Sequence, residues 1–133
     1  DVLHPGHVEY LAEARSRGGV LVVGLNPHAT VRRLKGPGRP VMDEHARAQM
    51  LSALACVDYI IPFSEDTPLR LIRLLRPDVL VKGGDYRGRP EAVVGRDEVK
   101  KWGGKTVIAS FKKGCSTTAL LDAIARRRKR PRR

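Results

Sequence analysis

Val20-Leu21-Val22-Val23-Gly24-Leu25 is an uninterrupted apolar run, and it decides the fold class. A short apolar run of this kind is typical of a strand that is buried on both faces of a parallel sheet. Gly18-Gly19 precedes it and Asn26-Pro27 follows it, and both pairs are turn signals. The segments on either side, 5–17 and 28–34, have helical patterns. The run therefore predicts a parallel strand between two helices.

The same alternation continues along the chain. Further buried strands are expected at 57–62, 79–82 and 106–109. Helices are expected from an Asp43 cap to residue 55, from an Asp66 cap with Pro68 at the first helical position, and over 96–102. A last helix opens at 114–118, with Leu120, Leu121 and Ile124 turned inward. This order predicts an α/β protein with a doubly wound parallel sheet.

The first helix opens on Asp1-Val2-Leu3-His4-Pro5-Gly6-His7. Proline favours the first helical position, which makes His4 the cap and His7 the third helical residue. The i, i+3 spacing puts both imidazoles on one face of a turn whose free N–H groups suit a phosphate. From these residues alone, a cap with a surface histidine is the more usual explanation, and a metal-binding pair is a third.

Charge separates the chain into two parts. The net charge is +12, but seven basic residues lie in the last eight positions and leave +5 on the rest. We therefore expect one domain over 1–125 and a disordered basic tail over 126–133. The tail could instead bind nucleic acid or an anionic membrane non-specifically.

Other classes of protein find little support in the composition. No apolar run approaches the roughly 20 residues of a membrane span. Cys56 and Cys115 form no metal-like cluster, and an intracellular thiol protein is favoured over a disulfide. A nucleic-acid-binding module would need basic residues and stacking aromatics on one face. Aromatic content is only 5% and the charge is concentrated in the tail, so this alternative ranks lower.

Four polar, glycine-rich segments follow strands or precede helices, at 4–7, 35–39, 82–86 and 114–118. In doubly wound folds, ligands bind at the carboxyl ends of strands, near the point where the strand order reverses. The four segments are therefore expected to converge on one cleft. Their cations, hydroxyls and N–H groups suit a polyanion.

Several blocks together resemble the His-x-Gly-His nucleotidyltransferase superfamily. Within it, the chain is most similar to the D-glycero-β-D-manno-heptose 1-phosphate adenylyltransferases, which occur alone or as the C-terminal half of bifunctional enzymes with a sugar kinase. The resemblance runs from residue 1 to about 125. The motif at 4–7 marks only the superfamily, whereas the blocks at 32–40 and 80–86 are more specific. The matching blocks are 1–8, 22–26, 31–40, 56–59, 65–69, 76–86 and 116–120.

The resemblance implies a reaction in which a sugar 1-phosphate attacks the α-phosphorus of ATP and pyrophosphate leaves. Mg²⁺ is expected on the ATP phosphates, with no dedicated protein metal site. The implied residues fall into three groups. Those expected to act in catalysis are His4, His7 and Lys35. Those expected to bind the nucleotide are Gly6, Arg47, Lys82, Gly84, Asp85, Ser116, Thr117 and Thr118. Those expected to bind the sugar phosphate are Asn26, Arg39 and Asp85.

The resemblance also implies a cytoplasmic enzyme, a homodimer or higher homo-oligomer as one option, and fusion to a sugar kinase or action after one. A cytidylyltransferase acting on glycerol 3-phosphate or a similar phosphate is the rival within the same class. From the residues alone, a helix cap remains the simpler explanation of Ser116. A solvated loop cation remains an alternative for Lys35, a surface residue for Arg47 and a turn residue for Asp85.

Three departures from the family pattern are visible. The implied strand order is 3-2-1-4-5, and its first, central strand would lie before Asp1, so we expect a longer natural chain. Pro27-His28 stands where family members commonly have Ser-Asp, which removes an acid near the sugar phosphate. The basic tail has no counterpart in the family.

Overall fold

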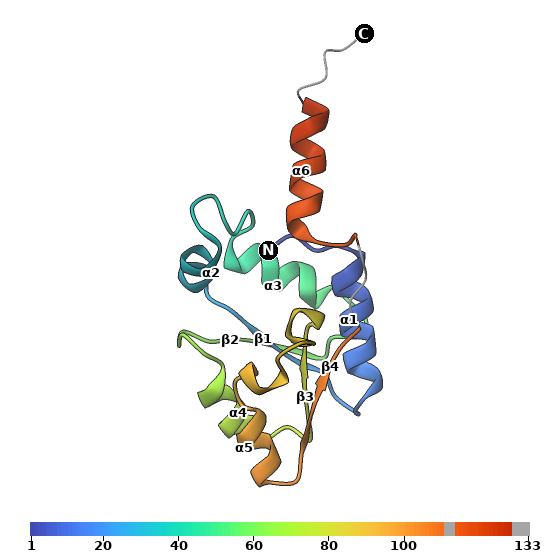
Figure 1. Cartoon of the computed structure of the whole chain (residues 1–133), viewed down its shortest axis with the longest axis vertical. Helices are drawn as coiled ribbons and strands as arrows, with labels where there is room; N and C mark the ends of the chain where they lie inside the picture. Colours follow the sequence, from blue (N-terminus) through green and yellow to red (C-terminus); the bar gives the residue numbers. More distant parts are fainter. Residues whose placement is uncertain (111–113, 129–133) are drawn as a thin grey trace.

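The computed structural model describes residues 1–110 and 114–128 (Figure 1). Helices and strands alternate through most of the chain, as the sequence predicts. In the first part the elements are α1 Pro5–Ser16, β1 Val22–Leu25, α2 His28–Lys35, α3 Glu44–Ser52 and β2 Tyr59–Pro62. In the second they are α4 Leu69–Leu75, β3 Val79–Lys82, α5 Arg96–Lys101, β4 Lys105–Ile108 and α6 Thr117–Arg128, with two short 3₁₀ turns, η1 Gly84–Tyr86 and η2 Pro90–Ala92.

The strands form two parallel pairs within the described residues. β1 pairs with β2, with Val22 opposite Tyr59, and β3 pairs with β4, with Val79 opposite Lys105. Figure 1 shows the two pairs running in different directions across the molecule. Each pair is joined by helical segments, as parallel strands require. The prediction of an α/β fold with parallel strands is confirmed.

The described residues do not form one continuous sheet. The expected order 3-2-1-4-5 places strands 2 and 3 side by side, and likewise strands 4 and 5. These are the two pairs observed, if β1 is counted as the second strand. The central strand of that order is not among the described residues. β1 and β3 therefore each have a hydrogen-bonded strand on one side only.

Small contacts join the two pairs. A side chain at Gly24 of β1 would lie 3.3 Å from Leu71 of α4 and 3.5 Å from the buried Phe63, so glycine allows the close approach. The Tyr10 hydroxyl of α1 donates to the carbonyl of Val81 in β3 (3.4 Å). The Tyr10 contact ties α1 to β3, and Gly24 lets β1 lie close to α4.

Two sequence predictions about helices are wrong, one about the cap of α4 and one about the inward face of α6. α4 begins at Leu69 without a side-chain cap, because Asp66 pairs instead with Arg33 of α2 (2.5 Å). The inward face expected for α6 is largely exposed, with Leu120 38% and Ile124 52% accessible. α6 projects from the body, so only its first turn lies against the rest of the chain (Figure 1).

The basic segment at the end of the chain also differs from the expected disordered tail. α6 continues through Arg126, Arg127 and Arg128, so these three residues are helical. Basic side chains in the last turn suit the negative end of the helix dipole. Residues 129–133 lie outside the described residues. Among the helices that are described, none has the length and apolar character needed to cross a membrane.

Candidate active site

The N-terminal turn of α1 has the arrangement that the sequence predicts. His4 is the cap, and its Nδ1 accepts from the Gly6 N–H (3.1 Å), while Pro5 is the first helical residue. The His4 carbonyl accepts from the His7 N–H (2.9 Å). The two imidazole centroids lie 3.9 Å apart. Both rings therefore share one face of the positive end of a helix.

His7 carries a buried nitrogen with no partner. Its Nδ1 is buried, and no hydrogen bond reaches it in the part of the chain that the structure describes. Burial, with the nearby positive charges of His4 and Lys35 as smaller causes, lowers the pKa of His7 to about 4. Burial also lowers the pKa of His4. Without a ligand, His7 is thus a neutral imidazole at pH 7. Neighbouring phosphates would favour its protonated form.

This lowered pKa predicts a measurable titration. In the free protein, the ring resonances of His7 should titrate with a midpoint near 4, the value to which burial lowers its pKa. Tripolyphosphate should move that midpoint upward, because a neighbouring anion stabilises the protonated ring. Nuclear magnetic resonance of the histidine side chains measures both values. A midpoint near 6.5 that is insensitive to tripolyphosphate would contradict the prediction.

The same shift links His7 to stability. Between pH 6.5 and about 4, the unfolded chain binds a proton that the folded chain does not. The contribution of His7 is therefore complete above pH 6.5 and is lost as the pH falls through that window.

The start of α6 lies against the histidine turn. A side chain at Gly6 would lie 3.0 Å from the Cβ of Cys115 and 3.0 Å from the His4 ring. Gly6 therefore lets two segments more than one hundred positions apart meet. The buried Thr117 hydroxyl donates to the Val2 carbonyl (3.4 Å), which fastens α6 to the opening segment.

The three hydroxyls expected to bind phosphate have different surroundings. Ser116 caps α6, because its Oγ accepts from the Ala119 N–H (3.0 Å). Thr117 is bonded to the main chain, and Thr118 is exposed. The cap that the residues alone favoured for Ser116 is therefore present. Ser116 and Thr117 place the N-terminus of α6 beside the two histidines, and any phosphate role for them remains a prediction.

Arg47 is a buried cation without a carboxylate. Its residue is 5% exposed, its Nη2 donates to the Asn26 carbonyl (3.0 Å), and its Nε is buried with no hydrogen-bond partner among the described residues. It takes part in none of the ion pairs found in residues 1–110 and 114–128. A buried charge in this condition costs free energy, and an anionic ligand would offset that cost.

Lys35 and Arg39, both expected near the phosphates, differ in their engagement. Lys35 is the last residue of α2, is exposed, and lies near enough to His7 to lower its pKa. Arg39 is paired through Nε with the Asp1 carboxylate. Its guanidinium is thus already neutralised, which counts against the expected contact with the sugar phosphate.

The end of β3 forms a second polar corner. The Lys82 ammonium lies 5.9 Å from the centroid of the Tyr86 ring, and the Lys82 carbonyl accepts from the Ala109 N–H (2.8 Å). Gly84 begins η1. The side chain of Asp85 lies outside the described part of the structure, so its expected contact with nucleotide or sugar stays a prediction.

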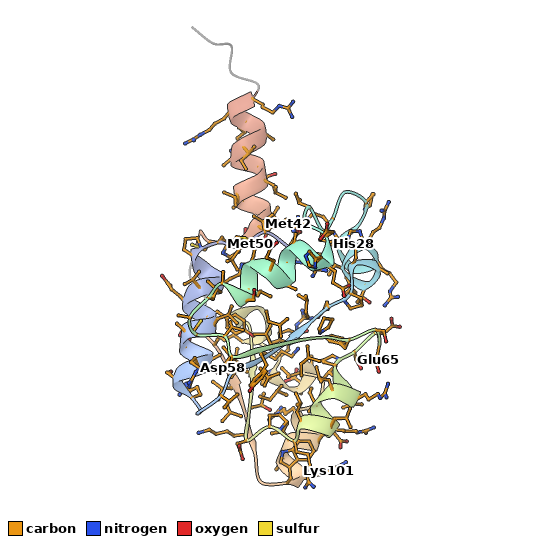
Figure 2. The ribbon with its side chains drawn as sticks, turned by 180° about the vertical axis from the view of Figure 1, so that it is seen from behind. His28, Met42, Met50, Asp58, Glu65 and Lys101 are labelled. Carbon is orange, nitrogen blue, oxygen red and sulfur yellow. The ribbon has the colours of Figure 1, made fainter. Side chains whose placement is uncertain are left out.

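Two acidic residues were missed by sequence reasoning. Asp1 pairs with Arg39, and Glu44 of α3 accepts from the His28 N–H at the start of α2 (3.2 Å), the place where the family acid is absent. Figure 2 labels His28 at this helix start. Both partners are far away in the chain, so spacing could not identify them. The place of Asp1 just before the histidine motif could have pointed to a role near the site. Nothing in the local sequence marked Glu44 in this way.

Taken together, the site presents two imidazoles, an exposed lysine, a buried arginine and two helix N-termini. This set can bind a polyanion and stabilise negative charge that develops on it. No group of three or more His, Cys, Asp or Glu side chains in the described residues is placed to hold a metal.

Most of the chain is similar to curated proteins. Bifunctional protein HldE of Geobacter metallireducens is 57% identical over 126 residues, and that of Syntrophotalea carbinolica is 54% identical over 124 residues. These matches cover 95% and 93% of the chain and 25% of each relative. The chain thus spans about a quarter of the length of the curated relatives it matches.

A solved structure has the same arrangement of elements. The crystal structure of the lipopolysaccharide core biosynthesis protein from Thermoplasma volcanium GSS1 matches with a TM-score of 0.72 and 29% identity, over 85% of this chain and 91% of that one. The cytidylyltransferase-like family model matches residues 1–121, which include the histidine turn and the start of α6. The resemblance stated from the sequence is confirmed: the chain belongs to the cytidylyltransferase-like family.

Proposed function

We propose that the chain transfers AMP from MgATP to D-glycero-D-manno-heptose 1-phosphate, giving ADP-heptose and pyrophosphate. The observation that carries this proposal is the buried, uncompensated Arg47 together with the partnerless Nδ1 of His7, in a site with two helix N-termini. Two buried polar atoms without a hydrogen-bond partner need an explanation, and an anionic ligand bound at this site would supply a partner for both. The heptose is supported by the family blocks at 32–40 and 80–86 and by the 57% identity to bifunctional protein HldE.

The chemistry needs no nucleophile from the protein. A phosphate monoester has its second pKa near 6, so the sugar phosphate is largely dianionic at neutral pH. One of its oxygens forms a bond to the α-phosphorus of ATP, the bond from that phosphorus to the bridging oxygen breaks, and pyrophosphate leaves. The protein must bring two polyanions together and stabilise the added charge.

Each residue has a task in this scheme. His7 enters as a neutral donor, and the bound phosphates then favour its protonated form. His4 stands beside it, and Lys35 supplies a mobile ammonium from the end of α2. Arg47 pairs with a phosphate and so compensates its buried charge. Mg²⁺ bound together with ATP would neutralise part of the charge on the nucleotide phosphates.

One assay tests the proposal. Pyrophosphate release is measured with ATP, CTP, GTP and UTP, each crossed with heptose 1-phosphate, other sugar 1-phosphates and glycerol 3-phosphate. We expect turnover with ATP and heptose 1-phosphate. Turnover with CTP and glycerol 3-phosphate would replace the proposed substrates by those of the rival transferase. Absence of turnover with every pair would reject the transferase itself.

The proposal also places the reaction in a pathway. Its sugar 1-phosphate must be supplied by enzymes that phosphorylate a sugar, which fits the name of the relatives as bifunctional proteins. The product fits lipopolysaccharide biosynthesis, the process named for the similar solved structure. A requirement for ATP is consistent with a cytoplasmic enzyme. A homo-oligomer stays a prediction.

A further inference from the structure

We infer that Asp1 is a positioning residue that holds the Gly36–Val41 loop and thereby sets Lys35 beside His7. The inference rests on the proposed function for its kinetic consequences. Asp1 uses both carboxylate oxygens within this loop: Oδ2 accepts from Arg39 Nε, and Oδ1 accepts from the Val41 N–H (2.7 Å). Its side chain is 2% exposed, whereas that of Arg39 is 16% exposed. A buried carboxylate with this charge-assisted pair is a strong, specific anchor.

The loop needs such an anchor because its own backbone offers little. Gly36 and Gly38 have φ values of +87° and +84°, in the region that favours glycine. A side chain at either position would meet no atom within 4 Å, so neither glycine packs against the body. Among the described main-chain hydrogen bonds, the loop has one within itself, from the Arg39 N–H to the Gly36 carbonyl (3.3 Å), and Gly36 donates to Arg32 at the end of α2. The Asp1 contacts therefore fix the far end of the loop.

The near end of the loop is Lys35. Its main-chain position is set by α2, whose last turn ends with the Gly36 N–H donating to the Arg32 carbonyl (2.9 Å). Lys35 is exposed, so no burial holds its side chain in place. The Asp1 contacts tie the other end of the loop to the segment that leads into the histidine turn. The ammonium is thereby kept within electrostatic reach of His7.

This inference assigns Arg39 a different task from binding the sugar phosphate. A phosphate competing for its guanidinium would have to displace a buried carboxylate, which costs the full desolvation of that carboxylate. Arg39 is thus the residue through which Asp1 holds the loop, and Lys35 is the cation that remains available to the ligand. Asp1 touches no reacting atom and acts through the loop.

The first test measures the anchor without any enzyme activity. Asp1→Ala removes both contacts, and we expect the Val41 amide to exchange with deuterium at least tenfold faster than in the wild type. Trypsin should cut the Lys35–Gly36 bond faster in the same variant; Arg39–Pro40 is not a trypsin site, so this bond reports on the loop. Asp66→Asn, which breaks the exposed pair with Arg33, is the matched control. Unchanged exchange at Val41 in a folded Asp1→Ala variant would overturn the anchor.

The second test asks whether Asp1 acts through Lys35. Asp1→Asn keeps the side-chain shape and the acceptor for Val41 but removes the charge that binds Arg39. We expect kcat to fall about tenfold in Asp1→Asn and in Arg39→Gln, and no further in the double variant, because coupled residues are non-additive. In a Lys35→Ala background, Asp1→Asn should change kcat less than twofold. Independent, multiplicative effects of Asp1→Asn and Lys35→Ala would overturn the positioning role.

The same single and double variants of Asp1 and Lys35 can be compared without turnover by measuring their affinity for inorganic tripolyphosphate by calorimetry. If the wild type binds tripolyphosphate but transfers no nucleotide, the proposed function fails while the same Asp1–Lys35 coupling in affinity still supports the anchor. If turnover is present but Asp1→Asn and Asp66→Asn behave alike, the anchor fails and the proposed function stands.

Discussion

Replacing His7 with alanine should lower kcat by at least about 100-fold while the fold stays intact, because a donor to the transition state is lost. The buried Nδ1 of His7 has no partner in the described structure, so no internal hydrogen bond is broken by the substitution. The measurement is steady-state pyrophosphate release, with thermal unfolding followed by circular dichroism as the check on folding.

His45 provides the matched control for this experiment. It is an exposed histidine on α3, and His45→Ala should leave kcat within about twofold of the wild type, as surface changes away from a site usually do. A loss of less than threefold in His7→Ala would show that the ring takes no part in the chemistry. His7→Gln, which restores an N–H donor without a charge, separates donation from protonation.

Arg47→Met should abolish tight binding of ATP, raising its dissociation constant about 100-fold, because a desolvated charge pair with a phosphate is worth several kcal/mol. The same variant should unfold with a free energy within about 1 kcal/mol of the wild type, since methionine fills the volume and, within the described residues, only the hydrogen bond to the Asn26 carbonyl is lost. Calorimetry with ATP and urea unfolding measure the two quantities.

The two quantities together distinguish a ligand site from a structural role. A structural arginine would lose stability on substitution and change affinity only as the fold loosened. Arg70→Met is the control: Arg70 is exposed and paired with Glu65, so neither affinity nor stability should change beyond about 0.5 kcal/mol. Unaltered ATP affinity in Arg47→Met would remove Arg47 from the site.

The parts of the fold that follow local rules could be predicted from the sequence. The cap at His4 and the proline after it depend on neighbours within three positions, and the structure has them as expected. The strand at Val22–Leu25 follows from a continuous apolar run, and its pairing with β2 follows from the alternation of helices and strands.

The parts that depend on distant partners could not. Thr117 donates to Val2 across most of the chain, and Asp1 meets Arg39 and Val41 through a loop whose path no spacing rule gives. Asp66 lies two residues before Pro68, where a helix cap is expected, but its carboxylate pairs with Arg33 instead. The apolar stripe of α6 follows helical periodicity, but periodicity does not say whether another surface covers it.

The candidate site was predictable in its members more than in their states. His4, His7 and Lys35 lie near one another, as the motifs indicated. The lowered pKa of His7, the missing counter-charge of Arg47 and the occupied guanidinium of Arg39 all arise from burial and from contacts between segments. Such quantities depend on three-dimensional packing, so a one-dimensional pattern does not contain them.

The separation of the strands into two pairs has a consequence for how the molecule opens. The most extensive contacts lie within β1–β2 and within β3–β4 with their own helices, which makes each half a natural unit of local unfolding. The histidine turn comes from one end of the chain and the first turn of α6 from the other, and they meet at Gly6 and Val2. A triphosphate held between them would fasten the histidine turn to the start of α6. At 100 times its dissociation constant, such a ligand adds about 2.7 kcal/mol to stability, and it would turn a chain that opens in parts into one that melts as a whole.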